Sequence, residues 1–178
     1  VQHEGVVQQH EWRMLPGGLL KLTFNYLPKN GDYDYVGLHF VYPEEQVTGV
    51  KYLGEGPYRV WKNRMKGGRF GVWQKDYNNT VTGESGWEYP EFKGYHASMY
   101  WAVIQNREQD FAVLSDSENL FLRLFTPQAP EGAYNENTDG VFPQGDISFM
   151  HGISPIGTKF KRPEQLGPQG YQNMVRSR

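Results

Sequence analysis

Apolar and polar residues alternate with a period of two along most of this chain, which is typical of half-buried β-strands. Between residues 19 and 27, for example, Leu20, Leu22, Phe24 and Tyr26 share one face of an extended chain. No long segment has the 3.6-residue period of an amphipathic helix. We therefore predict an all-β, antiparallel fold with strands at 6–14, 19–27, 33–42, 47–53, 69–73, 98–105, 111–115, 120–125 and 146–152, and a short strand around Trp87.

Turn-forming residues separate these segments. Asn30-Gly31 is a strong hairpin signal, so the first four predicted strands are expected to form an antiparallel meander. Gly54-Glu55-Gly56-Pro57 predicts a tight turn. The region 54–94 is irregular, and long irregular stretches in compact domains are often functional. Within it, Asn78-Asn79-Thr80 fits a glycosylation sequon, which we interpret as an exposed loop.

With 178 residues, the chain is expected to form a single domain spanning 1–178. It begins at Val1 rather than at a methionine, which indicates an excised piece, N-terminally truncated, of a larger protein. It contains no cysteine, so neither disulfides nor thiolate chemistry enter the interpretation.

The charge balance and the length of the apolar runs argue against nucleic acid and membrane as partners. Lysine and arginine number 18 against 20 aspartates and glutamates, a net charge of −2, whereas nucleic-acid-binding proteins usually carry a basic excess. No apolar run approaches the length of a membrane span. We expect neither nucleic acid nor membrane as a partner.

Aromatic residues are unusually frequent, with 5 Trp, 12 Tyr and 10 Phe. They can fill a core, or they can stack on the C–H faces of sugars while polar neighbours bind the hydroxyls. The irregular region combines rings with amide and guanidinium groups, as ligand pockets do. Its candidate carbohydrate-binding residues are Tyr58, Arg59, Trp61, Asn63, Arg64, Trp73 and Trp87.

Three elements occur in one order along the chain. The first is Gly54-Glu55-Gly56-Pro57 with Trp61 and Arg64; the second is Pro90-Glu91 with Gly94, before Tyr100-Trp101; the third is Met150-His151-Gly152-Ile153. Together they resemble the C-terminal, small-chain domain of the glycoside hydrolase family 2 β-galactosidases.

That resemblance implies an antiparallel supersandwich like that of galactose mutarotases. It also implies that the catalytic glutamates lie in a separate barrel domain, so we assign no catalytic residue to this chain. The implied function is that of a non-catalytic C-terminal β-sandwich domain, which packs on the barrel and shapes access of an oligosaccharide or polysaccharide. Glu91, His96 and His151 complete the predicted carbohydrate site.

Other interpretations stay open. The chain could be an autonomous carbohydrate-binding module, or a mutarotase-like enzyme, whose acid–base pair is usually a His with a Glu and for which His96 and His151 are the candidate histidines. We expect no cofactor, although the spacing of Asn135, Asn137, Asp139 and Asp146 echoes a calcium loop. The resemblance to hydrolases of polysaccharide-degrading bacteria favours a periplasmic or extracellular location.

Overall fold

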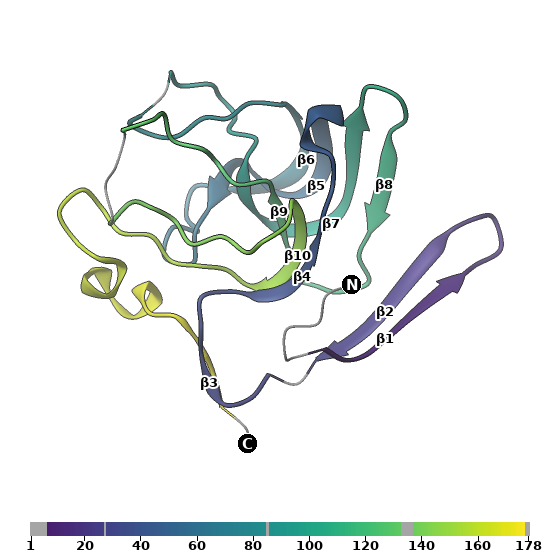
Figure 1. Ribbon diagram of the computed structural model, residues 1–178, viewed down its shortest axis with the longest axis horizontal. Coiled ribbons are helices and arrows are strands. Elements are labelled where there is room, and N and C mark those ends of the chain that lie inside the picture. Colours follow the sequence, from purple (N-terminus) through teal and green to yellow (C-terminus); the bar gives the residue numbers. More distant parts are fainter. Residues whose placement is uncertain (1–6, 27, 85, 133–136, 177–178) are drawn as a thin grey trace. The chain divides into compact units, whose positions relative to one another are not determined.

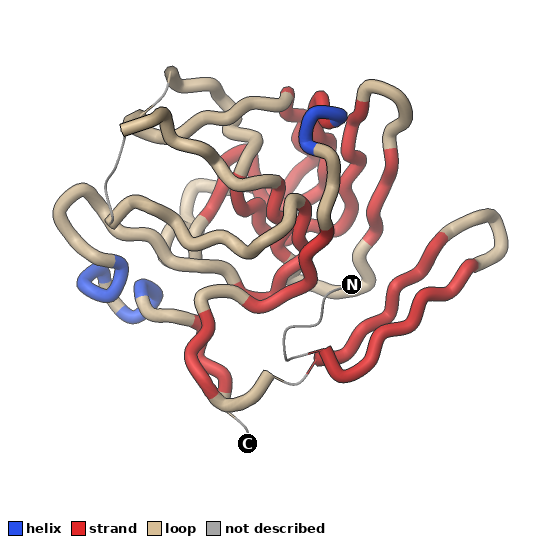
Figure 2. The backbone as a smooth tube through the Cα atoms, in the orientation of Figure 1, coloured by secondary structure: helices blue, strands red, loops and turns tan. Residues whose placement is uncertain are grey.

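The computed structural model describes residues 7–26, 28–84, 86–132 and 137–176. Its contacts divide the chain into two compact units, one spanning Asp34–Asn173 and the other combining Val1–Tyr33 with Met174–Arg178. Strands dominate the secondary structure, and helix is limited to short 3-10 turns (Figure 2). Within the described ranges, no helix is long and apolar enough to cross a membrane.

One seven-stranded antiparallel sheet forms the larger unit (Figure 1). Its order is β4-β10-β9-β7-β5-β6, and β8 also pairs with β7. The all-β prediction is confirmed, but the short strand expected around Trp87 is wrong, because that residue lies in a loop. The strands are β4 (Val36–Phe40), β5 (Val47–Val60), β6 (Arg69–Asp76), β7 (Gly94–Asn106), β8 (Phe111–Leu114), β9 (Phe121–Leu124) and β10 (Ile147–Gly152).

Strand β7 changes partner along one of its edges. Its first residues, 94–96, pair with β9, whereas residues 101–104 pair with β8. Between the two stretches lies Ser98, whose φ of 52° is unusual for a residue other than glycine. On its opposite edge, β7 pairs with β5 over most of its length. The sheet therefore forks at Ser98.

The predicted turn at Gly54–Pro57 is wrong, because β5 continues through it to Val60. The two glycines serve close packing instead. A Cβ on Gly54 would lie 2.8 Å from the carbonyl oxygen of Ala97, and one on Gly56 would lie 2.6 Å from the Trp73 ring. Glycine signals a turn in sequence, but it equally marks positions where other groups approach the backbone of a strand.

Two apolar clusters fill the interior of the larger unit. The first lies beneath the central strands and consists of Val47, Val50, Tyr52, Phe92, Met99, Ala102, Ile104, Leu120, Leu122, Leu124, Phe125 and Ile147. The second consists of Val60, Tyr95, Ala97, Met150 and Ile153, with Trp61 and Phe142 packed against it.

The guanidinium of Arg123 is also enclosed in this interior, with 0% of the residue exposed. It donates hydrogen bonds to the carbonyl oxygens of Gly145 (2.7 Å) and Pro143 (3.1 Å) and to the hydroxyl of Thr126. It also lies over the ring of Phe142, 5.9 Å from the centroid. One buried cation thereby ties β9 to the segment 143–145.

The opposite face of the sheet carries an apolar row across four strands. Leu53 of β5 lies opposite Val72 of β6 and Trp101 of β7, and Trp101 lies opposite Leu114 of β8. Their neighbours in sequence, such as Tyr52, point into the core, so alternation places these four side chains on the other face. We call these four residues the outer row. Val72 is 53% and Leu114 71% exposed.

The smaller unit contains the hairpin of β1 (Val7–Met14) and β2 (Leu20–Tyr26). It also contains β3 (Gly31–Tyr33), which pairs with β11 (Asn173–Val175), a strand whose last two residues belong to this unit. The meander predicted for the first four strands is therefore wrong beyond β1 and β2. Strand β4 pairs with β10, more than 100 residues away, and β5 pairs with β6 and β7. Local turn signals carry no information on such distant pairing.

The C-terminal part of the chain holds two 3-10 helices, η2 (Pro163–Leu166) and η3 (Pro168–Gly170). A third, η1 (Glu44–Gln46), precedes β5.

Candidate functional site

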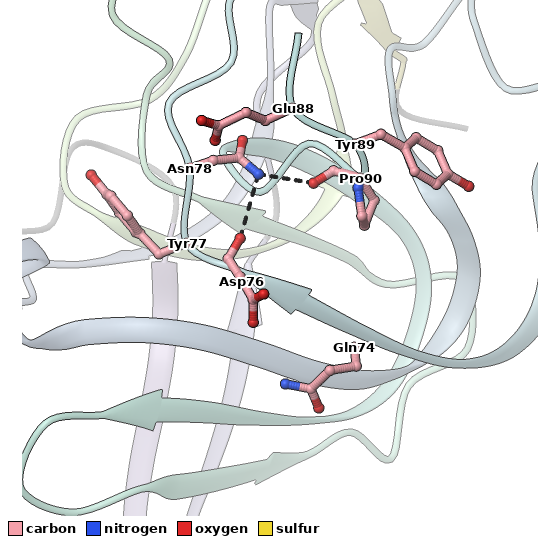
Figure 3. Close-up of a pocket in the computed structure, with 7 residues that line it drawn as sticks. All are labelled: Gln74, Asp76, Tyr77, Asn78, Glu88, Tyr89 and Pro90. Atoms are coloured by element: carbon pink, nitrogen blue, oxygen red, sulfur yellow. Dashed lines mark hydrogen bonds between the residues drawn. The ribbon is translucent and has the colours of Figure 1, made fainter.

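A pocket of about 240 Å³ opens beside strand β6, at the start of the loop that follows it. Figure 3 shows Asn78 at its centre, with Glu88 on one side and Asp76 on the other. The lining is mostly polar and comes from two segments, the end of β6 and the loop before β7. Its residues are Gln74, Asp76, Tyr77, Asn78, Glu88, Tyr89 and Pro90.

Asn78 holds these two segments together. Its side-chain nitrogen donates to the carbonyl oxygen of Pro90 at 2.9 Å, and its side-chain oxygen accepts from the backbone N–H of Phe92 at 3.2 Å and from the Thr80 hydroxyl at 2.9 Å. With 8% of the residue exposed, Asn78 is buried. The interpretation of its sequon as an exposed loop is therefore wrong, because the amide is engaged in the interior.

We expect Asn78→Ala to lower the free energy of unfolding by about 2 kcal/mol, because buried partners lose their hydrogen bonds. Asn78→Asp keeps an accepting oxygen but loses the donor to Pro90 and places a charge in the interior, so it should not restore the stability. Urea unfolding measures both, and hydrogen exchange of residues 78–92 locates the change. An alanine variant as stable as the parent chain contradicts this role.

Three exposed aromatic rings stand next to the pocket and contact one another in series. Trp87 stacks on Tyr89, with ring centroids 5.2 Å apart, and Tyr89 contacts Tyr58 at 5.7 Å. All three are substantially exposed, Trp87 by 62%. We call Trp87, Tyr89 and Tyr58 the aromatic ridge. The ridge brings together two of the predicted site residues, Tyr58 and Trp87, from β5 and from the loop.

Beneath the pocket, strand β6 points a lysine into the core. Lys75 is 1% exposed, and its ammonium group donates to the carbonyl oxygen of Glu91 (2.9 Å) and to Nδ1 of His96 (3.1 Å). An ammonium can only donate, so Nδ1 accepts, and Nε2 of His96 donates to the carbonyl oxygen of Phe92 at 2.8 Å. The tautomer of His96 is thus fixed by its neighbours.

This cluster also contains charges of both signs. Burial lowers the pKa of Lys75 to about 7, an effect that the carboxylate of Glu91 opposes and the guanidinium of Arg59 reinforces. Burial, and then the charge of Lys75, hold the pKa of His96 well below its usual value. Arg59 donates to the carbonyl oxygen of Thr80 at 2.7 Å. Arg59 and Glu91 therefore belong to the support behind the pocket.

Further predicted site residues anchor the chain after β5. Trp61 packs against Tyr95 and Phe142, with centroids 5.4 and 5.1 Å away. The side chain of Asn63 donates to the carbonyl oxygen of Ile156 and accepts from its N–H, at 2.8 and 3.0 Å. These are packing and clamping contacts.

The remaining predicted residues are dispersed. Arg64 is exposed, while Trp73 is half-buried and donates to the carbonyl oxygen of Gly54 at 3.3 Å. His96 is fully buried, whereas His151 on β10 is exposed, and desolvation lowers its pKa. The side chain of His96 does not reach the surface, where an acid–base partner of His151 would have to stand.

A sequence model described as the β-galactosidase small chain matches residues 2–138. The chain belongs to the β-galactosidase small-chain family. Comparison with curated proteins and with solved structures gives no match. The family predicted from the order of the three elements is thus confirmed, although the third of them, Met150–Ile153, lies beyond the matched range.

In this small-chain domain, the first two elements meet in the interior. Gly94 has a φ of 119°, and a Cβ there would lie 3.2 Å from Cδ of Arg59. A residue with a side chain is strained in this backbone conformation and would press on the arginine. The Gly54–Pro57 and Pro90–Gly94 elements therefore build the support around Arg59 and Lys75, behind the pocket.

The calcium loop considered from the sequence is only partly described, because Asn135 lies outside the described residues. Asp146 accepts a hydrogen bond from the backbone N–H of Tyr42 at 2.8 Å, while Asp139 is exposed. Among the described residues, no group of three or more His, Cys, Asp or Glu side chains has the arrangement of a metal site.

Sequence reasoning missed Lys75, Tyr89 and the carboxylates of the pocket as site residues. Two signals could have found some of them. Strict alternation in β6 places Lys75 on the same side as Trp73, hence inward. Alternation also puts Trp87 and Tyr89 on one side of an extended segment, as the ridge requires.

Proposed function

We propose that this chain is a non-catalytic, supersandwich-like domain of a family 2 β-galactosidase-like glycoside hydrolase. In that enzyme it packs on the catalytic barrel and shapes the access of carbohydrate substrates. The membership of the small-chain family supports the association with other domains of a parent enzyme. The observation that carries the proposal is the outer row.

The outer row has the properties of a surface that another domain covers. Its four apolar side chains cross four strands, so the patch is continuous. Leaving such a patch in water forgoes roughly 25 cal/mol for each Å² that could be buried. Contiguous apolar patches on soluble domains mark sites of protein association. Residues from four different strands would all contact the same partner surface.

A catalytic role of the chain alone finds less support. A mutarotase-like reaction needs an accessible acid–base pair. Both ring nitrogens of His96 are already hydrogen-bonded in the interior, to Lys75 and to the carbonyl oxygen of Phe92. We therefore propose that the acid and base of the parent enzyme lie outside this chain, in the barrel.

The double variant Val72→Glu with Leu114→Glu tests the proposal. We expect it to weaken association with the upstream catalytic portion by at least about tenfold, because burying unpaired carboxylates is costly. The activity of the assembled enzyme falls in parallel. Binding is measured by titration of this chain against the separately produced upstream portion, and activity with an aryl β-galactoside.

Val41→Glu is the matched control, because Val41 is 88% exposed and lies outside the outer row. All variants should melt at the temperature of the unchanged chain, since exposed substitutions alter stability little. If the outer-row variant associates and activates like the control, the row is not the docking surface and the proposal fails.

We further propose a periplasmic or extracellular location in a bacterium, as expected for an enzyme that meets polysaccharide outside the cell. Fractionation of the source cells, followed by immunodetection of the parent protein, tests this. Recovery in the cytoplasmic fraction contradicts it.

A further inference from the structure

We infer that the aromatic ridge and the adjacent pocket form a binding site of this chain for neutral hexopyranose sugars. One sugar ring packs on a ring face of the ridge that the neighbouring ring leaves open, and its hydroxyls enter the pocket. This activity goes beyond the proposed function, because it belongs to the isolated chain and requires neither the barrel nor the outer row.

The apolar half of the site is the ridge. Trp87 and Tyr89 lie with ring planes 28° apart and centroids at 5.2 Å, so each ring covers part of one face of the other and only the outer faces are open to a ligand. Tyr58 extends the ridge at 5.7 Å from Tyr89. Tyr and Trp combine an apolar body with a polar tip, which suits ligands that have both kinds of surface. A pyranose presents such a surface, with C–H groups on its faces and hydroxyls at its rim.

The polar half of the site is the pocket. Within the described part of the chain, the side-chain carboxylates of Asp76 and Glu88 have neither a hydrogen bond nor an ion pair. Carboxylates accept hydrogen bonds and cannot donate when ionised, so they match a ligand that supplies O–H donors. Hydrogen bonds to charged groups are also stronger than neutral ones. Gln74 adds an amide to the same lining.

The size of the pocket limits the ligand. Its volume of about 240 Å³ lies just below the range of about 300–1,000 Å³ that holds drug-sized molecules. One sugar ring fits this scale better than several. Additional rings of an oligosaccharide would continue along the ridge, over Tyr58.

The site is largely pre-organised. Asn78 fixes the backbone of Pro90 next to Tyr89, and its Oδ1 accepts from Thr80. The Lys75 ammonium holds the carbonyl of Glu91 one residue further on. Binding therefore orders little of the loop, and affinity is not lost to loop ordering.

A protein partner fits this surface less well than a sugar. Cores of protein interfaces are depleted in charged residues, whereas Asp76 and Glu88 line the pocket directly. Acidic sugars fit less well too, because their carboxylates would meet the two carboxylates of Asp76 and Glu88 in the pocket lining. The chemistry therefore selects neutral hexopyranoses.

The test is a titration of the full 178-residue chain, with tryptophan indole N–H signals followed by NMR. The neutral probes are β-1,4-galactotriose and cellotriose, and the acidic probe is trigalacturonic acid. We expect saturable shifts of one indole signal with at least one neutral probe. The acidic probe should bind at least about tenfold more weakly, equivalent to about 1.4 kcal/mol.

Variants assign the binding to the ridge. Trp87→Ala and Tyr89→Ala should each weaken it at least about tenfold, and Glu88→Gln should weaken it by a smaller factor. Phe160→Ala is the matched control, because Phe160 is an exposed ring (84%) outside the ridge, and it should bind as the unchanged chain does. Thermal melting of each variant verifies folding. Substitutions at these exposed positions should alter stability little.

Any of these results overturns the inference: no shift with either neutral sugar, unchanged binding in both ridge variants, or equal binding of the acidic probe. Loss of association with the upstream catalytic portion in Trp87→Ala, without sugar binding in the parent chain, also overturns it and identifies a protein interface. The Val72→Glu, Leu114→Glu variant should bind sugar normally. Failure of this inference and failure of the proposed function are thus separable.

Discussion

Arg123→Ala is expected to lower the free energy of unfolding by about 4 kcal/mol, the largest effect of any single change considered for this chain. The guanidinium donates to the carbonyl oxygens of Gly145 and Pro143 and to the Thr126 hydroxyl, and none of the arginine is exposed. The substitution leaves these acceptors without a donor and opens a cavity beside Phe142. Urea unfolding followed by tryptophan fluorescence measures the change.

Two further variants separate the causes. Arg107→Ala removes an exposed arginine and should change stability by less than about 0.5 kcal/mol. Arg123→Met fills most of the cavity but restores no donor, so it should lie between the wild type and Arg123→Ala. A loss of less than about 1 kcal/mol in Arg123→Ala would show that water replaces the guanidinium at little cost.

The second large effect is a rise in stability from about pH 7 to about pH 10 that depends on Lys75. The pKa of Lys75 is about 7 in the folded protein against 10.5 for an exposed lysine. Between these values the unfolded chain holds a proton that the folded chain has released. Raising the pH therefore favours folding, by at most about 1.4 kcal/mol per pH unit from this group.

Other titratable groups set the limits of this pH range. Below it, His96 acts in the same direction, because its folded pKa is also lowered. Above about pH 10, the buried tyrosines Tyr52 and Tyr95, whose pKa values burial raises, favour the unfolded state, in which they ionise first. Within the window, Lys75→Met should flatten the rise, whereas Lys51→Met, on the exposed face of β5, should preserve it. Urea unfolding at several pH values measures this, and a wild-type curve that is flat or falls contradicts it.

The fold was predictable to the extent that it depends on local alternation. Segments 47–53, 111–115 and 146–152 are strands as expected, because burial on one face imposes a period of two. Pairing was not predictable in the same way. The partner of β4 is β10, and no residue near Val36 indicates a strand more than 100 residues away.

The candidate site was predictable in composition more than in geometry. The concentration of rings in the region 54–94 indicated the ridge, and Tyr58 and Trp87 are part of it. Trp61, by contrast, packs against Phe142 in the interior, although the sequence predicts a role in binding for it as it does for Tyr58 and Trp87. An aromatic residue looks the same in sequence whether it fills a core or faces solvent, and only the three-dimensional packing distinguishes the two cases.

The fork of the sheet at Ser98 determines which part of the domain can unfold locally. Within the described residues, strand β8 pairs with β7 alone, while β9 pairs with both β7 and β10. The pairing of β7 with β8 can therefore break while the first residues of β7 stay paired with β9. Cooperative units of this kind open at a lower free energy than the whole fold. We expect Leu114, at one end of the outer row, to move with β8 when this strand opens.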